Sequence, residues 1–177
     1  MSSLVTHLKY EELTPGQKSA YYSKIARDGR VTNMQATLLR SVPAFNAYIE
    51  WYNLRDILIP IFGERAIWIF CHSISEGTDC LICSTFFRRI LIDAGISPAD
   101  YQPNELDALL ISLGNTFINQ GHGIDPDVWQ ALQARYDDET LVALVAFGGL
   151  MVANNLFNNL LNVELDDYLE GYRRPQE

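Results

Sequence analysis

The chain has 177 residues, of which 48% are hydrophobic and 20% charged, a composition typical of a globular protein with one sizeable core. Its 13 Lys and Arg against 22 Asp and Glu give a formal net charge of −9. This balance argues against nucleic acids and anionic membrane surfaces as partners, because both bind cationic residues. The N-terminal segment lacks the basic and apolar runs of a signal peptide, and the longest apolar run, 141–152, is shorter than the about 20 residues that span a bilayer. We therefore expect a cytoplasmic protein.

Helical patterns dominate the chain from its N-terminal part onward. The predicted helices cover, in chain order, about residues 16–26, 33–40, 43–58, 64–77, 80–94, 106–119, 125–136 and 137–162. Pro15, Pro43 and Pro126 suit first helical turns, whereas Pro60 and Gly63 are expected to end the third helix. No alternating pattern longer than about four residues predicts a strand. The sequence thus predicts an all-α protein with a single helical domain over residues 1–177.

The last predicted helix is apolar on nearly every turn. Gly148 and Gly149 permit the close approach of another helix, and asparagines follow at helical spacings in "ANNLFNNLLN". A helix that is apolar all round needs burial on all sides, which a monomer of this size provides with difficulty. We therefore expect a subunit interface, and hence a homo-oligomer, at this helix.

Cys80 and Cys83 form a Cys-x-x-Cys pair at the predicted start of a helix, which Thr78 or Asp79 is expected to cap. Residues at i and i+3 share one helix face, so the two sulfurs can meet. The free N–H groups and the positive dipole end of the helix would stabilise a thiolate there. The pair can form a reversible disulfide, contribute to a metal site or fill a core.

The metal alternative has few ligands available. A structural zinc site needs four ligands at tight spacing, and only Cys71 and His72 lie near the pair in the sequence. Three cysteines are also too few for a disulfide framework, so in a reducing compartment the pair is more consistent with redox use. We interpret Cys71 as a core residue and expect no metal and no cofactor.

A reactive cysteine needs a lowered pKa and an acceptor for its proton. Glu64, Trp68, His72 and Glu76 recur every four residues and so form one stripe on the predicted helix 64–77. Our hypothesis is that Glu64 or Glu76 orients His72, which takes the thiol proton. The alternative is that Glu64 is a helix-start acid and His72 a buried, hydrogen-bonded histidine. The candidate catalytic residues are Cys80, Cys83, His72, Glu76 and Glu64.

Other polar and aromatic residues receive plainer interpretations. His122, in a glycine-flanked loop, and His7, in the N-terminal segment, are interpreted as ordinary surface polarity. Aromatic residues near the pair are expected to be core residues, with some of them lining an apolar vestibule over the thiols; they are Trp51, Tyr52, Trp68, Phe70, Phe86 and Phe87.

Four stretches together resemble the carboxymuconolactone decarboxylase and alkyl hydroperoxidase D-like family, specifically its peroxidase-related members. They are "MQATLLRSVPAFNAYIEWYNLRD", "ERAIWIFCHSISEGTDCLIC", "RILIDAGIS" and the segment 108–166, within about residues 31–168. In the redox-active branch, a glutamate 12 residues before the first cysteine and a histidine four residues after the second relay a proton. Here these two positions hold Trp68 and Phe87, so the sequence keeps the thiol pair and departs from the relay.

The resemblance implies an alkyl hydroperoxide reductase-like enzyme with a peroxide substrate. In the resembled family the second cysteine, here Cys83, meets the peroxide, and the first, here Cys80, resolves it. The helix dipole alone would favour Cys80 as the more acidic thiol. An external thiol would then reduce the disulfide, and the assembly would be a trimer or hexamer. The alternatives are a lactone decarboxylase like the founding members, which need no thiol pair, and a non-catalytic oligomeric binding protein on the same scaffold.

Overall fold

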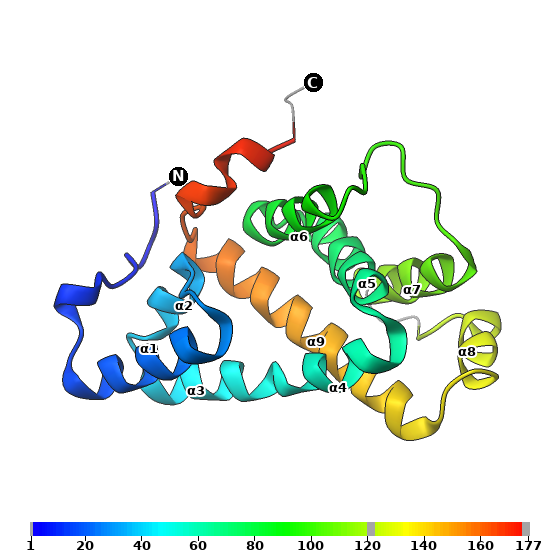
Figure 1. Cartoon of the computed structure of the whole chain (residues 1–177), viewed down its shortest axis with the longest axis horizontal. Coiled ribbons are helices and arrows are strands. Elements are labelled where there is room, and N and C mark those ends of the chain that lie inside the picture. Colours follow the sequence, from blue (N-terminus) through cyan, green and yellow to red (C-terminus); the bar gives the residue numbers. More distant parts are fainter. Residues whose placement is uncertain (1, 120–122, 175–177) are drawn as a thin grey trace.

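One long helix, α9 (Asp138–Leu161), runs through the middle of the molecule, and other helices pack around it (Figure 1). The computed structural model describes residues 2–119 and 123–174. The helices in contact with α9 are α3 (Val42–Trp51), α4 (Asn53–Phe62), α5 (Glu64–Gly77), α6 (Leu81–Asp93) and α8 (Pro126–Gln133). Since the described ranges contain helices, turns and bends but no strand, the prediction of an all-α fold is confirmed.

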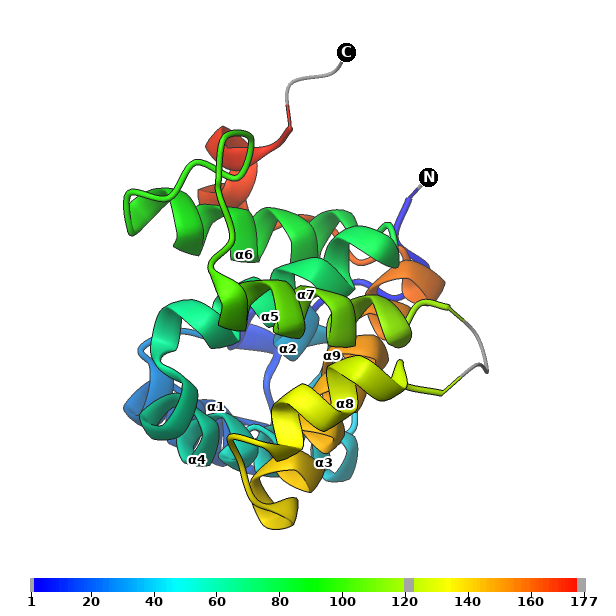
Figure 2. The same cartoon turned by 90° about the vertical axis from the view of Figure 1, so that its right-hand side faces the viewer.

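The remaining helices flank this group. They are α1 (Pro15–Asp28), α2 (Asn33–Leu38), α7 (Glu105–Thr116) and the short 3-10 helices η1 (Tyr10–Glu12) and η2 (Asp167–Tyr172). Thr14, Thr32 and Asn104 each begin a helix with a reciprocal capping box. Figure 2, turned by 90°, shows α6 above α5 and α7, with α1 and α4 below them. The α5 helix packs against both α6 and α7, so the helix that leads into the α5–α6 turn has a neighbouring helix on two sides.

The predicted helix 43–58 is wrong, because the structure divides this region into α3 and α4 at Tyr52. Tyr52 is both the C-cap residue of α3 and the N-cap residue of α4. Pro60 does not end the second of these helices but lies inside it. The fixed φ of proline is compatible with a helix, and its missing N–H removes one backbone hydrogen bond. Near the C-terminal end of α4 this loss does not end the helix. The helix ends at Gly63 instead, whose φ of +83° few other residues adopt.

Part of the apolar surface of α9 is buried within this one chain, with fewer than half of the residues in its most apolar stretch fully buried. Leu141, Leu144 and Leu150 are fully buried, whereas Leu156 and Leu160 remain exposed near the C-terminal end. The expectation that one chain would hardly bury this helix therefore holds only for part of its surface. By length and composition the 24-residue helix would suffice to cross a bilayer, a test that the core helix of a globular protein also passes. The homo-oligomer stays a prediction.

Candidate functional site

The two cysteines of the pair lie where α5 turns into α6. Cys80 is the N-cap residue of α6 and Cys83 lies in its first turn. The predicted cap at Thr78 or Asp79 is therefore wrong. Asp79 adopts a left-handed backbone conformation, with φ of +50°, and carries the chain through the turn one residue longer than expected. Since Cys80 makes no side-chain cap hydrogen bond, its sulfur is free for other contacts.

One asparagine of α9 contacts both sulfurs. Asn158 Nδ2 lies 3.2 Å from Cys83 Sγ and 3.9 Å from Cys80 Sγ. Both cysteines are free thiols, and both are buried. An amide N–H that points at a sulfur favours its thiolate form over the thiol. The structure thus brings together the two predicted thiols and supplies a hydrogen-bond donor that the sequence analysis did not assign.

The two thiols differ in acidity because the thiol of Cys83 donates a hydrogen bond to the sulfur of Cys80. The pKa of Cys80 is lowered, chiefly by the hydrogen bond from Cys83, with a further contribution from Asn158. The pKa of Cys83 is raised, because the same hydrogen bond holds its proton and because the side chain is buried. A single negative charge on the pair is therefore favoured on Cys80, and Cys83 keeps its proton. Cys71 lies in the core, where burial raises its pKa.

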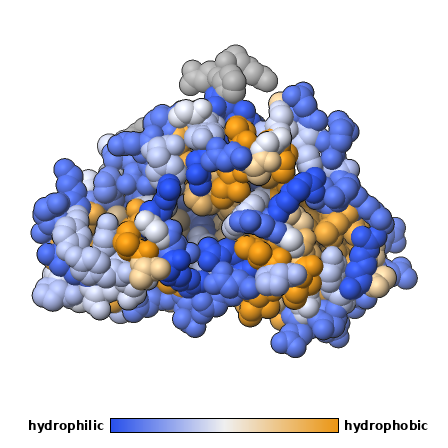
Figure 3. Space-filling model, in the orientation of Figure 1, coloured by the Kyte–Doolittle hydropathy of each residue, from blue (hydrophilic) through white to orange (hydrophobic). Residues whose placement is uncertain are grey.

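A cavity of about 360 Å³ opens beside the thiol pair, and Cys83 lies on its wall. The wall is built from α1, α2, α4, α5, α6, α9 and η2 and from the α3–α4 junction, and its aromatic part contains Tyr52, Trp68, Phe86 and Phe87. Figure 3 shows the surface hollowed near the centre of the face on which α2, α6 and α9 lie in Figure 1. The expectation of an apolar vestibule over the thiols is confirmed only in part, because aromatic residues line the cavity beside Cys83, but charged residues line it too and Cys80 does not.

The two positions at which the resembled motif carries a glutamate and a histidine lie against each other here. The rings of Trp68 and Phe87 stack with centroids 6.0 Å apart and an angle of 29° between their planes. Both rings line the cavity. An apolar pair therefore fills the place in which the motif has an acid and an imidazole, and both of its rings contribute to the cavity wall.

The proposed relay residues occupy other places. His72 Nε2 lies 3.5 Å from Glu76 Oε1, and both side chains line a second cavity together with Tyr101 and Asn115. Glu64 is the exposed first residue of α5, at the opposite end of the helix from Glu76. The structure thus brings His72 and Glu76 together but sets them in a different cavity from Cys83. The relay stays a prediction.

His72 is mainly a neutral imidazole at pH 7. Burial lowers its pKa to about 4, and the positive charges of Arg174 and Arg88 act in the same direction. The Glu76 carboxylate, which would favour the charged imidazole, is itself paired with Arg174. A base with so low a pKa has little affinity for a thiol proton. His122 lies outside the described residues.

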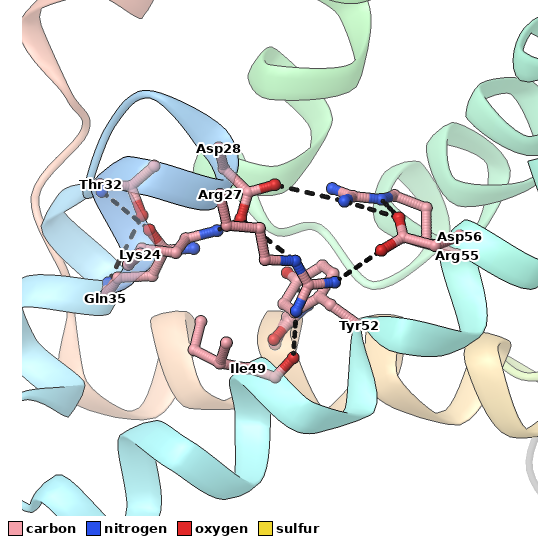
Figure 4. Close-up of polar contacts among 10 residues, drawn as sticks. Lys24, Arg27, Asp28, Thr32, Gln35, Ile49, Tyr52, Arg55 and Asp56 are labelled. Carbon is pink, nitrogen blue, oxygen red and sulfur yellow. Dashed lines mark hydrogen bonds and ion pairs between the residues drawn. The ribbon is translucent and has the colours of Figure 1, made fainter. Parts of the chain in front are cut away.

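A network of charged side chains borders the cavity on the side of α1 and α4 (Figure 4). Lys24 pairs with Asp28, and Asp28 also accepts a hydrogen bond from Arg55 at 3.2 Å. Arg27 and Arg55 both reach Asp56 at 2.8 Å. Lys24 is only 6% exposed, and burial lowers its pKa although the Asp28 carboxylate opposes this. The sequence analysis assigned no role to this network.

The asparagines of α9 are the site residues that the sequence analysis missed. Asn155 and Asn159 bind Thr78 in the turn before Cys80, at 2.6 and 3.1 Å. Asn154 and Asn158, also four residues apart, face the cavity instead. The signal was present in the sequence, because polar residues repeated every four positions within an apolar helix indicate a buried polar stripe.

The chain has an all-α fold of the alkyl hydroperoxidase D-like type. Two solved structures of the debrominase Bmp8 share the fold, and each match covers 97% of this chain and 96–97% of the other chain. Bmp8 without ligand has a TM-score of 0.72 and 15% sequence identity. A Bmp8 variant lacking one cysteine, in complex with 2,3,4-tribromopyrrole, has a TM-score of 0.76 and 14% sequence identity. An uncharacterized peroxidase-related protein from Silicibacter sp. TM1040 has a TM-score of 0.70 and 12% identity. No family model and no curated protein matches the sequence.

Proposed function

We propose that this protein is a thiol-dependent oxidoreductase that reduces hydroperoxides through Cys80 and Cys83. The observation that carries the proposal is the position of Cys83 on the cavity wall, with Cys80 behind it and Asn158 donating toward both sulfurs. A peroxide in the cavity would meet Cys83 first. The likeness to a peroxidase-related protein supports the same class of reaction.

The thiol pair supplies the electrons in this reaction. The Cys83 proton shifts along its hydrogen bond to Cys80, and the Cys83 thiolate attacks the terminal oxygen of the peroxide. The O–O bond breaks, leaving a sulfenic acid on Cys83 and an alcohol. The Cys80 thiol then displaces hydroxide as water and forms the disulfide. In sum, two thiols and one hydroperoxide give one disulfide, one alcohol and one water, and an external thiol of a protein or small molecule restores the dithiol.

A second candidate reaction is the reductive removal of bromine from an aromatic ring. It is favoured by the fold shared with the debrominase Bmp8 and by the aromatic side chains of Trp68 and Phe87 on the cavity wall. Here the two thiols and one bromoarene would give one disulfide, one arene in which hydrogen replaces bromine, and hydrogen bromide. The electron source is the same in both reactions, so the thiol pair alone does not separate them.

Titration of the reduced protein tests both reactions. We expect one equivalent of cumene hydroperoxide to consume two thiols and to form a disulfide between Cys80 and Cys83, identified by mass spectrometry of the digested protein. A parallel titration with 2,3,4-tribromopyrrole, with free bromide as the readout, tests the second candidate. Loss of thiols to the bromoarene but not to the peroxide would replace the first reaction by the second. No thiol loss with either oxidant would contradict an enzymatic role of the pair.

A further inference from the structure

Two buried asparagine oxygens on the cavity wall have no partner among the described residues. Asn154 and Asn158 are each 3% exposed, and both line the cavity. Their amide nitrogens are used, by Tyr52 and by the thiol pair, but Oδ1 of each accepts no hydrogen bond from the described part of the chain. Buried acceptors are normally satisfied, so two of them on one wall indicate a ligand that donates an O–H or N–H hydrogen.

Tyr52 places a hydrogen-bond donor beside these acceptors. Asn154 Nδ2 donates to Tyr52 Oη at 2.8 Å. Because the tyrosine oxygen accepts this bond, its own hydrogen is left for another acceptor, and it forms no hydrogen bond to the rest of the described chain. Tyr52 is half-buried and lines the cavity with Cys83. The wall next to the thiol thus contains one O–H group and two asparagine side chains whose Oδ1 atoms lack a partner among the described residues.

We propose that Tyr52, Asn154 and Asn158 form a subsite for the –O–O–H head of an alkyl hydroperoxide, and that Tyr52 is the proton donor to the leaving oxygen. This assignment rests on the proposed function and names the group that acts in place of the imidazole absent at Phe87. The Oδ1 atom of Asn154 or Asn158 accepts a hydrogen bond from the terminal O–H of the hydroperoxide. The Tyr52 hydroxyl donates a hydrogen bond to the other peroxide oxygen, which bears the carbon chain. The terminal oxygen then faces Cys83.

The proton balance of the step closes with one proton taken up from solvent. Cys83 sulfur forms a bond to the terminal oxygen, the O–O bond breaks, and the departing oxygen takes the proton of Tyr52 as it leaves as an alcohol. The tyrosinate regains a proton from solvent, which compensates the proton that the dithiol released when it became a monothiolate. A positioned acid of this kind accelerates the departure of a basic alkoxide.

The charged network of Figure 4 suits a transient negative charge on Tyr52. Lys24 Nζ lies 5.7 Å from the centroid of the Tyr52 ring. Burial and the neighbouring Cys83 raise the pKa of Tyr52, so its hydroxyl keeps its proton until a strongly basic alkoxide forms beside it, while the positive charge of Arg55 acts in the opposite direction. Figure 4 shows Tyr52 together with the charged network. The ion pairs with Asp28 and Asp56 fix these cations in place.

The test compares Tyr52→Phe with wild type and with Tyr48→Phe. Tyr48 lies on α3 and packs on Phe157, so it is a matched control for the loss of a hydroxyl. We expect Tyr52→Phe to lower the second-order rate of thiol oxidation by cumene hydroperoxide about 100-fold. Its oxidation by diamide, which has no leaving oxygen, should match wild type, and Tyr48→Phe should match wild type with both oxidants. An unchanged rate of Tyr52→Phe with cumene hydroperoxide would overturn the proton donor.

Binding of 2-phenyl-2-propanol, the alcohol formed from cumene hydroperoxide, separates the subsite from the chemistry. We expect the alcohol to bind wild type in a ligand-detected NMR titration and to bind Tyr52→Phe and Asn154→Leu about 10-fold more weakly. If wild type binds in this way but leaves the peroxide unreduced, the proposed function fails and the subsite stands. Equal binding to all three proteins would overturn the subsite.

Discussion

Asn158 of α9 donates a hydrogen bond to Cys83 Sγ over 3.2 Å, although the two residues lie 75 positions apart in the sequence. The contact joins the central helix to the first turn of α6, so the thiol pair is held by the core of the fold and not by its own turn alone. It also places the amide where a thiolate on either sulfur gains from it, since Cys80 Sγ lies 3.9 Å from the same nitrogen.

We expect Asn158→Ala to raise the pKa of the more acidic thiol by about 1–2 units, because a hydrogen bond to a charged group contributes about 1.5–3 kcal/mol. The pH dependence of alkylation by iodoacetamide measures this value. Asn159→Ala is the matched control, because Asn159 donates to the Thr78 backbone and to neither sulfur. An unchanged thiol pKa in Asn158→Ala would show that the amide does not stabilise the thiolate.

The cysteine variants separate the attacking thiol from the resolving one. With cumene hydroperoxide, Cys80→Ser should form a stable sulfenic acid on Cys83, trapped by dimedone, because the resolving thiol is absent. Cys83→Ser should form none, because Cys83 is the cysteine on the cavity wall. Cys71→Ala, which changes only a core side chain, should still form the disulfide. Trapping on Cys80 in Cys83→Ser, and none on Cys83, would reverse the assignment.

The sequence predicts the helices well and the site only in part, for a physical reason. Helix starts are local: Thr14, Thr32 and Asn104 bind their own third residue, and such spacing is visible in one segment. The division of 43–58 at Tyr52 depends instead on the packing of both helices against α9. A stripe of asparagines was visible too, but no local rule says which of them faces a sulfur 75 residues away.

The second cavity leads to a prediction about stability in acid. His72 has a folded-state pKa of about 4 against an ordinary value of 6.5, so between these pH values the unfolded chain binds more protons. The contribution of His72 to the free energy of unfolding is therefore complete above pH 6.5. It is lost as the pH falls toward 4, by at most about 1.4 kcal/mol for each pH unit. In His72→Gln this loss should be absent. Urea unfolding of both proteins at pH 7.5 and 5.5 measures the difference.

The same variant tests the proposed relay. Because His72 and Cys83 line different cavities, we expect His72→Gln to leave the alkylation rate of the thiols within about twofold of wild type, whereas a true general base contributes about 100-fold or more. His7→Gln, at a partly exposed position in the N-terminal segment, controls for the loss of an imidazole. A raised thiol pKa in His72→Gln alone would support the relay.

Two adjacent glycines of α9 should respond differently to the same substitution. A Cβ on Gly148 would lie 2.4 Å from Cζ of Phe117, whereas a Cβ on Gly149 would meet Trp51 at an ordinary 3.6 Å. Phe117 packs edge-on against the buried Phe70, so its ring has little room to yield. We expect Gly148→Ala to lower the free energy of unfolding by about 1–3 kcal/mol, the usual range for an overpacked core.

Gly149→Ala should leave the free energy of unfolding unchanged or raise it by up to about 1 kcal/mol, because alanine has the higher helix propensity and its methyl group fits. Urea unfolding at pH 7.5 measures both variants under one condition. Equal effects of the two substitutions would mean that the Phe117 ring does not press on α9. A larger loss in Gly149→Ala than in Gly148→Ala would indicate that the face of α9 near Trp51 is covered in solution by something beyond this chain, as the predicted homo-oligomer requires.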